Sequence, residues 1–574
     1  MPEPIRSPSE HVGTLGLLAV APVVAMATVS LSMRGGMMLG LGLRPAALVG
    51  IASVVLLALF SFGFSGLRTL VPVRPSATEV LVLIGILAIL VVLWDRAADR
   101  SLVWPHLFGA DPAHHVAIVT YIADTGHLLE DDERLQGLGS YPVGSHLVAA
   151  ALTSITGRAP VVTMWWAGMA ASVSQLFGIV WLTRTSSAKR SWGGAGVALV
   201  LWFGAWYFGL GALTVSFFFS QLLAVSFCIV GVGLVLLGVR GLPIRQWVPA
   251  VGVLTLATLL TYPQHAVVLP AAVAVPVAFT ILSRLRKRST RGRIAVVGAA
   301  VAVLAGVLAL SFSRLASSPY LTRQAIFGVG EGFLPPFTVA SMGGALAVLL
   351  LGAGAVHLGA RSIRADRGAL VLLCAMAAPA TLFVGLTVLR LLGEPVTTYR
   401  ATKNVYVILP LVIAAAGASV AESVRMVHEC LLAHRFSRET RPVESWTAVV
   451  GMVVAVLLVS RPTPLRVAWE PLVDRDAYVL SEAVVKRYPR GDVGVVSEGI
   501  SSYVLWFVFF RENTLTPTDP IAPPITAWNT WPDGPRDERY LLVDADSAGR
   551  YSTKPGVRVV GRNNGALLLE RPPA

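Results

Sequence analysis

Long, uninterrupted apolar runs constrain this chain more than any other feature. A helix needs about 20 apolar residues to cross the roughly 30 Å hydrocarbon layer of a bilayer. Windows of about that length recur about thirteen times, near 12–33, 45–66, 78–94, 160–182, 192–210, 215–238, 246–262, 264–282, 294–312, 336–357, 369–391, 403–423 and 444–460. Only 14% of the residues are charged, against about 25% in soluble domains. The sequence therefore predicts an α-helical polytopic membrane protein with about thirteen spans.

The distribution of charge predicts how these spans are oriented. The net charge is +14, but the residues from 461 onward carry 14 Lys and Arg and 14 Asp and Glu, so the whole excess lies in the first 460 residues. It is concentrated in short connections at 183–190, 283–293, 361–367 and 424–442. Such loops are cytoplasmic under the positive-inside rule, which places the N-terminus inside and both the loop 95–141 and the tail outside a cytoplasmic membrane. Because the basic residues are divided among span ends, membrane lipids are the expected surroundings and no nucleic-acid partner is expected.

The tail, 461–574, has a different pattern from the rest of the chain. Four segments, GDVGVVSEGISSYVLWFVFF, RYLLVDADSAG, GVRVVGR and NGALLLERP, have the pattern of short β-strands that end in Gly or Asp turns, and 476–489 (DAYVLSEAVVKRYP) has helical spacing. These runs predict a small extracytoplasmic α/β domain at 461–574, following a membrane domain at 1–460. The string DAD at 544–546 follows a predicted strand and is interpreted as a turn.

One segment, 142–157 (PVGSHLVAAALTSITG), is too short for an ordinary span. If it crosses the membrane, it reverses the orientation of everything that follows. Two alternatives remain open from the sequence: the segment is re-entrant, or the division of 160–210 into two spans is wrong. This choice decides whether His146 lies at the outer face.

The loop after the third window is rich in titratable side chains. Asp111-Pro112 is typical of a helix start, with Asp as N-cap and Pro in the first turn. If the helix continues, Asp111 and His115 lie one turn apart on the same face. From the spacing alone, Asp111 is either a catalytic acid or the cap of an interfacial helix. The run Glu130–Glu133 is more typical of a solvated charge cluster than of catalytic groups.

These residues resemble a pattern found in the GT-C superfamily of membrane glycosyltransferases, which take sugars from polyprenyl-phosphate donors. The matching positions are an acid with following histidines, Asp111, His114 and His115, and the turn 141–146 (YPVGSH), which ends at His146 and in which Val143 departs from the commoner second proline. The resemblance implies that Asp111 is the general base. It also implies substrate-binding roles at His114, His115, His146, Asp131 and Asp132, with the two aspartates as the next candidates for the base.

Transfer with inversion needs one carboxylate to take the proton of the acceptor hydroxyl while the lipid phosphate leaves as a stable anion. The leaving phosphate needs cations at the membrane surface. Tyr399, Arg400 and Lys403 lie at the predicted outer end of a span, and His265 lies in the short outer connection TYPQH. We expect these four to bind the donor phosphate, with Arg323 as a weaker candidate. The alternative for each is an interfacial anchor, because such side chains commonly extend to lipid headgroups.

The sequence leaves open whether the site binds a metal. Asp111 or Asp124 with the two adjacent histidines could bind a divalent cation, and no cofactor is certain.

The sequence resembles actinobacterial arabinofuranosyl- and mannosyltransferases, which implies a polyprenyl-phosphate sugar as donor and an envelope glycan or glycolipid as acceptor. Two other classes remain. A flippase for a lipid-linked precursor would need ionisable residues at mid-membrane depth, and these spans hold almost none. A non-catalytic assembly scaffold would spread the loop on the surface.

Overall fold

The computed structural model describes most of the helical part of the chain and the strands of the tail. The described residues are 8–69, 77–97, 111–128, 141–187, 192–204, 219–285, 366–393, 403–433, 492–496, 539–563 and 566–572, with isolated positions at 352–362, 401, 450–454 and 483–488. They form two compact units by backbone contacts, one of 1–93, 168–210 and 220–461, the other of 94–167, 211–219 and 462–574. The boundary between 460 and 461, as a division into a membrane domain and a separate domain, stays a prediction.

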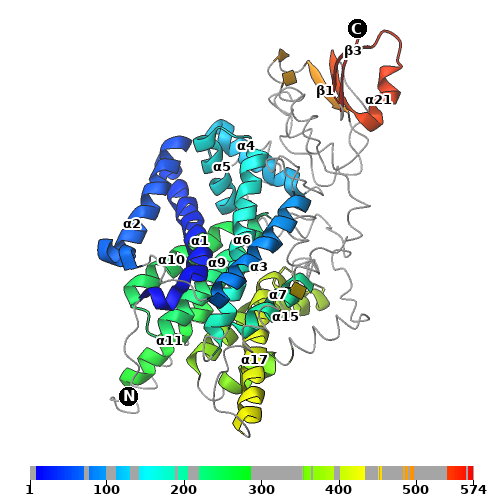
Figure 1. The fold of residues 1–574 in the computed structure, drawn as a ribbon. Helices are drawn as coiled ribbons and strands as arrows, with labels where there is room; N and C mark the ends of the chain where they lie inside the picture. The colour runs from blue at the N-terminus through cyan, green and yellow to red at the C-terminus, as the bar shows by residue number, and fades with distance from the viewer. Residues whose placement is uncertain are drawn as a thin grey trace. The chain divides into compact units, whose positions relative to one another are not determined.

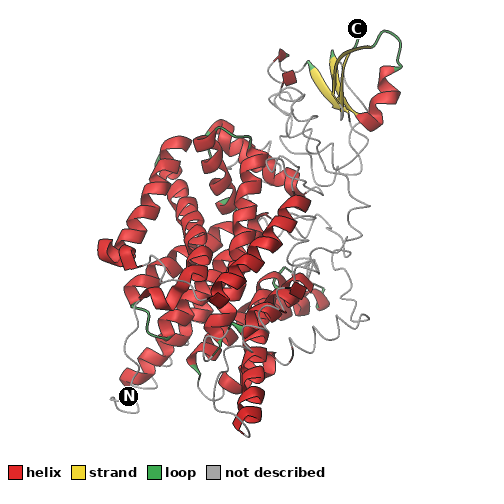
Figure 2. Ribbon diagram, in the orientation of Figure 1, coloured by secondary structure: helices red, strands yellow, loops and turns green. Residues whose placement is uncertain are grey.

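The chain is predominantly helical, with one small sheet in the tail (Figure 2). The helices of the apolar part are α1 (Pro8–Met38), α2 (Leu43–Thr69), α3 (Ala77–Ala97), α4 (Asp111–Thr125), α5 (Gly144–Thr156), α6 (Pro160–Ser186), α7 (Gly193–Gly204), α9 (Phe219–Val239), α10 (Ile244–Thr261), η3 (Pro263–His265), α11 (Val268–Leu285), α15 (Arg367–Leu391) and α17 (Val405–Ala433).

Eight helical stretches among the described residues are long and apolar enough to cross a bilayer. They correspond to eight of the expected windows, while those at 78–94 and 192–210 contain shorter apolar helices, Ala77–Val91 and Gly193–Trp202. The window at 294–312, and most of those at 336–357 and 444–460, lie outside the described residues. The fold class predicted from the sequence, a multi-span helical membrane protein with a small C-terminal α/β part, is thus confirmed, and the count of thirteen stays a prediction.

Within the first unit the long helices pack side by side (Figure 1). One group consists of α1, α2 and α10; another runs from α11 to α15, from α15 to α17 and from α17 to α7. Glycines allow the closest approaches: a Cβ at Gly233 of α9 would collide with the indole ring of Trp181 on α6, and one at Gly194 of α7 with the backbone carbonyl of Gly417 on α17. Close backbone approach at small residues is the usual basis of helix association in membranes.

The segment 142–157 forms a separate short helix. Helix α5 has 13 residues, ends at Thr156 and is capped by Gly157, whose positive φ of 66° suits glycine. Helix α6 begins three residues later and runs for 27 residues, and α7 follows as a distinct helix of 12. The described part of 160–210 thus contains two helices, of which only α6 is long enough to be a span, and the division into two spans stays a prediction. Whether α5 is re-entrant stays open.

The tail contains a four-stranded sheet in the order β1-β2-β4-β3, made of β1 (Val493–Val496), β2 (Tyr540–Asp544), β3 (Arg558–Asn563) and β4 (Ala566–Glu570). Strands β1 and β2 are parallel, and the other pairs are antiparallel. Leu541, Val543 and Leu569 pack with Tyr551 of α21 (Ala545–Ser552). Each of the four segments predicted to form strands contains one, and the remainder of the first segment, 497–510, lies outside the described residues. The turn expected at 544–546 is wrong, because Asp544 ends β2 and α21 begins at the next residue.

Candidate active site

A buried pair of histidines joins α4 to α5. His115 Nδ1 and His146 Nε2 lie 2.9 Å apart, and the two side chains are 1% and 0% exposed. The rings of Tyr141 and Phe219 meet both imidazoles edge-on, with centroid distances of 5.5 to 5.8 Å. The histidine pair is therefore enclosed by aromatic side chains, where a positive charge on an imidazole would cost free energy.

His146 makes further contacts beyond its pair with His115. Burial lowers the pKa of His146 well below 6.5, and the neighbouring His115 lowers it further, while a hydrogen bond to the Pro142 backbone opposes both effects. His146 Nδ1 also lies 3.4 Å from Ser145 Oγ. Which ring of the pair donates to the other is set by the tautomers of the two histidines.

The structure places only part of the predicted loop site. Helix α4 begins at Asp111, as the Asp-Pro sequence predicts, and His115 and His146, both predicted to bind substrate, are brought together. The side chains of Asp111 and His114 lie outside the described residues, as do Asp131 and Asp132 entirely. Their predicted roles therefore stay predictions.

The sequence left a metal site open, and the described residues do not decide it. Asp124 is exposed on α4, whereas His115 is buried. Among the side chains that the structure describes, no three His, Cys, Asp or Glu lie together as metal ligands would. The side chains of Asp111 and His114 are outside that set, so the question of a divalent cation at the start of α4 stays open.

A second polar cluster lies at the start of α17 and is called here the lysine cluster: Gln221, His265, Lys403 and Asn404. Lys403 is 5% exposed, and its Nζ donates to Gln221 Oε1 at 3.0 Å. The Lys403 carbonyl accepts hydrogen bonds from Gln221 Nε2 at 3.1 Å and from His265 Nε2 at 3.1 Å. Asn404 Nδ2 donates to the Ala401 carbonyl at 3.1 Å. Lys403 thus connects α9, η3 and the start of α17 through its side chain and its backbone carbonyl.

Two of the four residues expected to bind phosphate, His265 and Lys403, are thus brought together by direct contact. Tyr399 and Arg400 lie outside the described residues, and so does Arg323. Gln221 was not predicted. Its signal in the sequence is a single amide in an otherwise apolar helix, since a polar side chain inside a bundle needs a partner there.

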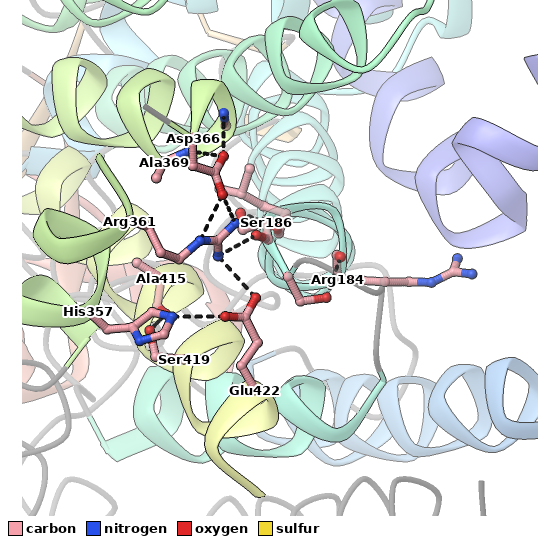
Figure 3. A network of polar contacts seen from close by, with 12 residues as sticks. Arg184, Ser186, His357, Arg361, Asp366, Ala369, Ala415, Ser419 and Glu422 are labelled. Atoms are coloured by element: carbon pink, nitrogen blue, oxygen red, sulfur yellow. Dashed lines mark hydrogen bonds and ion pairs between the residues drawn. The ribbon is translucent and has the colours of Figure 1, made fainter. Parts of the chain in front are cut away.

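A third polar group, called here the arginine network, consists of His357, Arg361, Asp366 and Glu422 (Figure 3). Arg361 donates to Glu422 Oε1 at 3.0 Å, to Asp366 Oδ2 at 2.9 Å through Nε, and to the Ser186 carbonyl at 3.1 Å. His357 Nε2 lies 2.8 Å from Glu422 Oε2.

Asp366 also caps α15 by accepting from the backbone N–H groups of Gly368 and Ala369. Partial burial raises the pKa of Asp366, but hydrogen bonds from Arg361 and the two N–H groups outweigh it and hold the pKa below its usual value. The described members of the arginine network therefore hold neighbouring helical segments together.

The lysine cluster and the arginine network lie at opposite ends of two apolar stretches, Phe219–Val239 of α9 and Val405–Ser423 of α17. Nineteen positions separate Lys403 from Glu422 along α17, and nineteen separate Gln221 from Arg240 at the end of α9. Arg240 donates to the Ser187 carbonyl, next to the network. At 1.5 Å per residue the spacing is about 28 Å, close to the roughly 30 Å of a hydrocarbon layer.

No protein-family model matches this sequence, and no curated protein matches it. Among solved structures, ArnT from Cupriavidus metallidurans bound to undecaprenyl phosphate is similar, with 14% identity over 86% of this chain and 98% of that one and a TM-score of 0.45. The oligosaccharyltransferase of Archaeoglobus fulgidus in its apo form has 13% identity, over 83% of this chain and 71% of that one, and a TM-score of 0.48. ArnT in its apo state has 14% identity over 86% and 98%, with a TM-score of 0.44.

Proposed function

We propose that this chain is an inverting glycosyltransferase of the cytoplasmic membrane. It would move a sugar from a polyprenyl-phosphate donor to a hydroxyl of a cell-envelope glycan or glycolipid at the outer face. The resemblance of the sequence to arabinofuranosyl- and mannosyltransferases favours a pentosyl or hexosyl donor from an actinobacterial envelope.

The observation that carries the proposal is the position of the lysine cluster. A buried ionisable group in a membrane bundle is costly and is by default a sign of function. Lys403 lies just before α17, about 28 Å from Glu422 at the far end of the apolar stretch Val405–Ser423. The basic connections 183–190 and 361–367 belong to the Glu422 end, which is therefore cytoplasmic under the positive-inside rule. Lys403 then lies at the depth of the outer headgroups, where a lipid phosphate resides.

Each predicted residue then has a chemical role. Lys403 offers a point charge to the phosphate, and Arg400, three residues earlier, a planar fork. Asp111 takes the proton of the acceptor hydroxyl as the new glycosidic bond forms and the bond from the anomeric carbon to phosphate oxygen breaks. The lipid phosphate leaves as an anion, so no second carboxylate is needed to protonate it.

The depth of the charges weighs against a flippase. The buried charged side chains among the described residues are Glu79, Lys403 and Glu422. Glu79 lies in the first turn of α3, Lys403 just before α17, and Glu422 at the far end of the span Val405–Ser423. A flippase would need such groups at mid-membrane depth. The burial of the histidine pair and the lysine cluster likewise weighs against a scaffold that acts through exposed surface.

The test uses the full-length protein in detergent, synthetic polyprenyl-phosphate arabinose and mannose, and envelope glycan acceptors. Asp111→Asn should abolish transfer and keep donor binding. Lys403→Met should weaken binding of the donor and of sugar-free polyprenyl phosphate by about 10- to 100-fold, since a hydrogen bond to a charged group contributes about 1.5 to 3 kcal/mol. Lys554→Met, an exposed lysine of the tail, is the matched control. Failure of the wild type to transfer from any donor would favour the flippase or scaffold.

A further inference from the structure

The lysine cluster contains buried polar atoms without a hydrogen-bond partner. Among the described residues, His265 Nδ1 and Asn404 Oδ1 have no hydrogen-bond partner, and the two side chains are 0% exposed. Burying such an atom unpaired costs about 1 to 3 kcal/mol. Nine buried side-chain atoms in the described residues lack a hydrogen-bond partner, and two of them fall in this one polar cluster, which points to a ligand there.

The bonds already made determine what that ligand must offer. His265 Nε2 faces the carbonyl oxygen of Lys403 at 3.1 Å, so Nε2 carries the proton and donates. In the neutral imidazole the other nitrogen then has a lone pair and no hydrogen. Asn404 Nδ2 donates to the Ala401 carbonyl, which fixes the amide orientation and leaves Oδ1 as an acceptor. Both unpaired atoms therefore accept hydrogen bonds.

Two acceptors do not suit a phosphate, whose oxygens are also acceptors when ionised. They suit hydroxyl groups. We propose that His265 Nδ1 and Asn404 Oδ1 accept hydrogen bonds from hydroxyls of the transferred sugar, while Lys403 alone of the three contacts the phosphate. This assignment rests on the proposed function and revises the role of His265, which the sequence predicted as a phosphate ligand.

The proposal gives the enzyme a means of selecting its sugar. A site built to receive a hydroxyl strongly rejects an analogue that lacks it, because the buried acceptors then stay unpaired. His265 is held in place by three contacts: its ring with the Lys403 carbonyl, its ring with Tyr262 at a centroid distance of 4.6 Å, and its own carbonyl with Cys228 Sγ at 3.6 Å. The accepting nitrogen is therefore fixed in position before the sugar arrives.

The experiment compares binding of a lipid phosphate with and without an attached sugar. Binding of polyprenyl phosphate and of its arabinosyl and mannosyl phosphodiesters is measured with the full-length protein by native mass spectrometry. His265→Phe and Asn404→Leu should each weaken binding of a sugar-bearing lipid by about 10- to 100-fold and leave binding of sugar-free polyprenyl phosphate within about twofold. Lys403→Met should weaken binding of both kinds of lipid. His357→Phe, a histidine at the opposite end of the unit, should change neither.

Singly deoxyfluoro sugars identify the hydroxyl, because fluorine cannot donate. One such analogue should bind the wild type about 10- to 100-fold more weakly yet bind Asn404→Leu or His265→Phe no worse than the parent sugar does. If both variants weaken the two lipids equally, His265 and Asn404 bind phosphate or shape the site, and the inference is overturned. Unchanged sugar binding overturns it as well and assigns the acceptors to bound water. If the wild type binds neither lipid, the proposed function itself fails.

Discussion

The histidine pair predicts a specific dependence of stability on pH. Because burial lowers the pKa of His146 well below 6.5, the folded protein keeps this ring neutral, while the unfolded chain takes up a proton as the pH falls through 6.5. A lowered folded-state pKa in a histidine means that its stabilising contribution is present above pH 6.5 and is lost below it. Where the unfolded state binds one proton more than the folded state, the free energy of unfolding falls by about 1.4 kcal/mol for each pH unit. Between pH 7.5 and 5.5 the folded state should lose about 1.4 kcal/mol through this group.

The assay is equilibrium unfolding by SDS in mixed micelles at pH 7.5, 6.5 and 5.5. His146→Gln cannot take up a proton and should lose less stability over this range, by about 1.4 kcal/mol. It should also be less stable than wild type at pH 7.5, since it disturbs the bond to His115. His127→Gln, an exposed histidine just beyond α4, is the matched control and should behave as wild type. Equal pH dependence in wild type and His146→Gln would refute the reasoning, because the folded protein would then accept the proton.

Two further predictions concern the scaffold. Arg361→Met removes the cation that contacts two carboxylates, and it should lower the free energy of unfolding by about 3 kcal/mol in the same SDS titration. The exposed control Arg562→Met should have little effect. Equal effects of the two substitutions would show that the arginine network does not stabilise the fold. Gly194→Val forces a side chain into the backbone of Gly417 and should cost about 1 to 3 kcal/mol, while Gly252→Val, with open space around it, should cost less, and the reverse order would contradict the packing.

The fold could be predicted from the sequence because the signals are local. Apolar length predicts spans, Asp111-Pro112 predicts the start of α4, and β-branched runs predict the tail strands. Span count could not be fixed in the same way, since α7 has only 12 residues although its window is longer. The turn expected after Val543 failed for a similar reason: DAD has turn composition, yet Asp544 finishes a strand and α21 follows directly.

The candidate site was less accessible to sequence analysis because its contacts join distant positions. His115 and His146 are 31 residues apart, and Gln221 and Lys403 are 182 apart. Residue type predicted that His265 and Lys403 both bind the donor phosphate, and the hydrogen bond from His265 Nε2 to the Lys403 carbonyl is what leads us to propose a different ligand for His265. That bond forms only when η3 and α17 are packed together, so the sequence alone does not indicate it.

The packing of α17 explains how Lys403 is held where it is. The middle of the helix is a run of small residues, and there the backbone at Ala416 lies against Gly354 and that at Gly417 against Gly194. Such close contacts leave no room for the helix to slide or rotate. At one end, Glu422 is tied to Arg361. Because an α-helix has a fixed rise, these contacts set the depth of Lys403 at the other end, so a substitution at Gly194 should disturb lipid phosphate binding as well as stability.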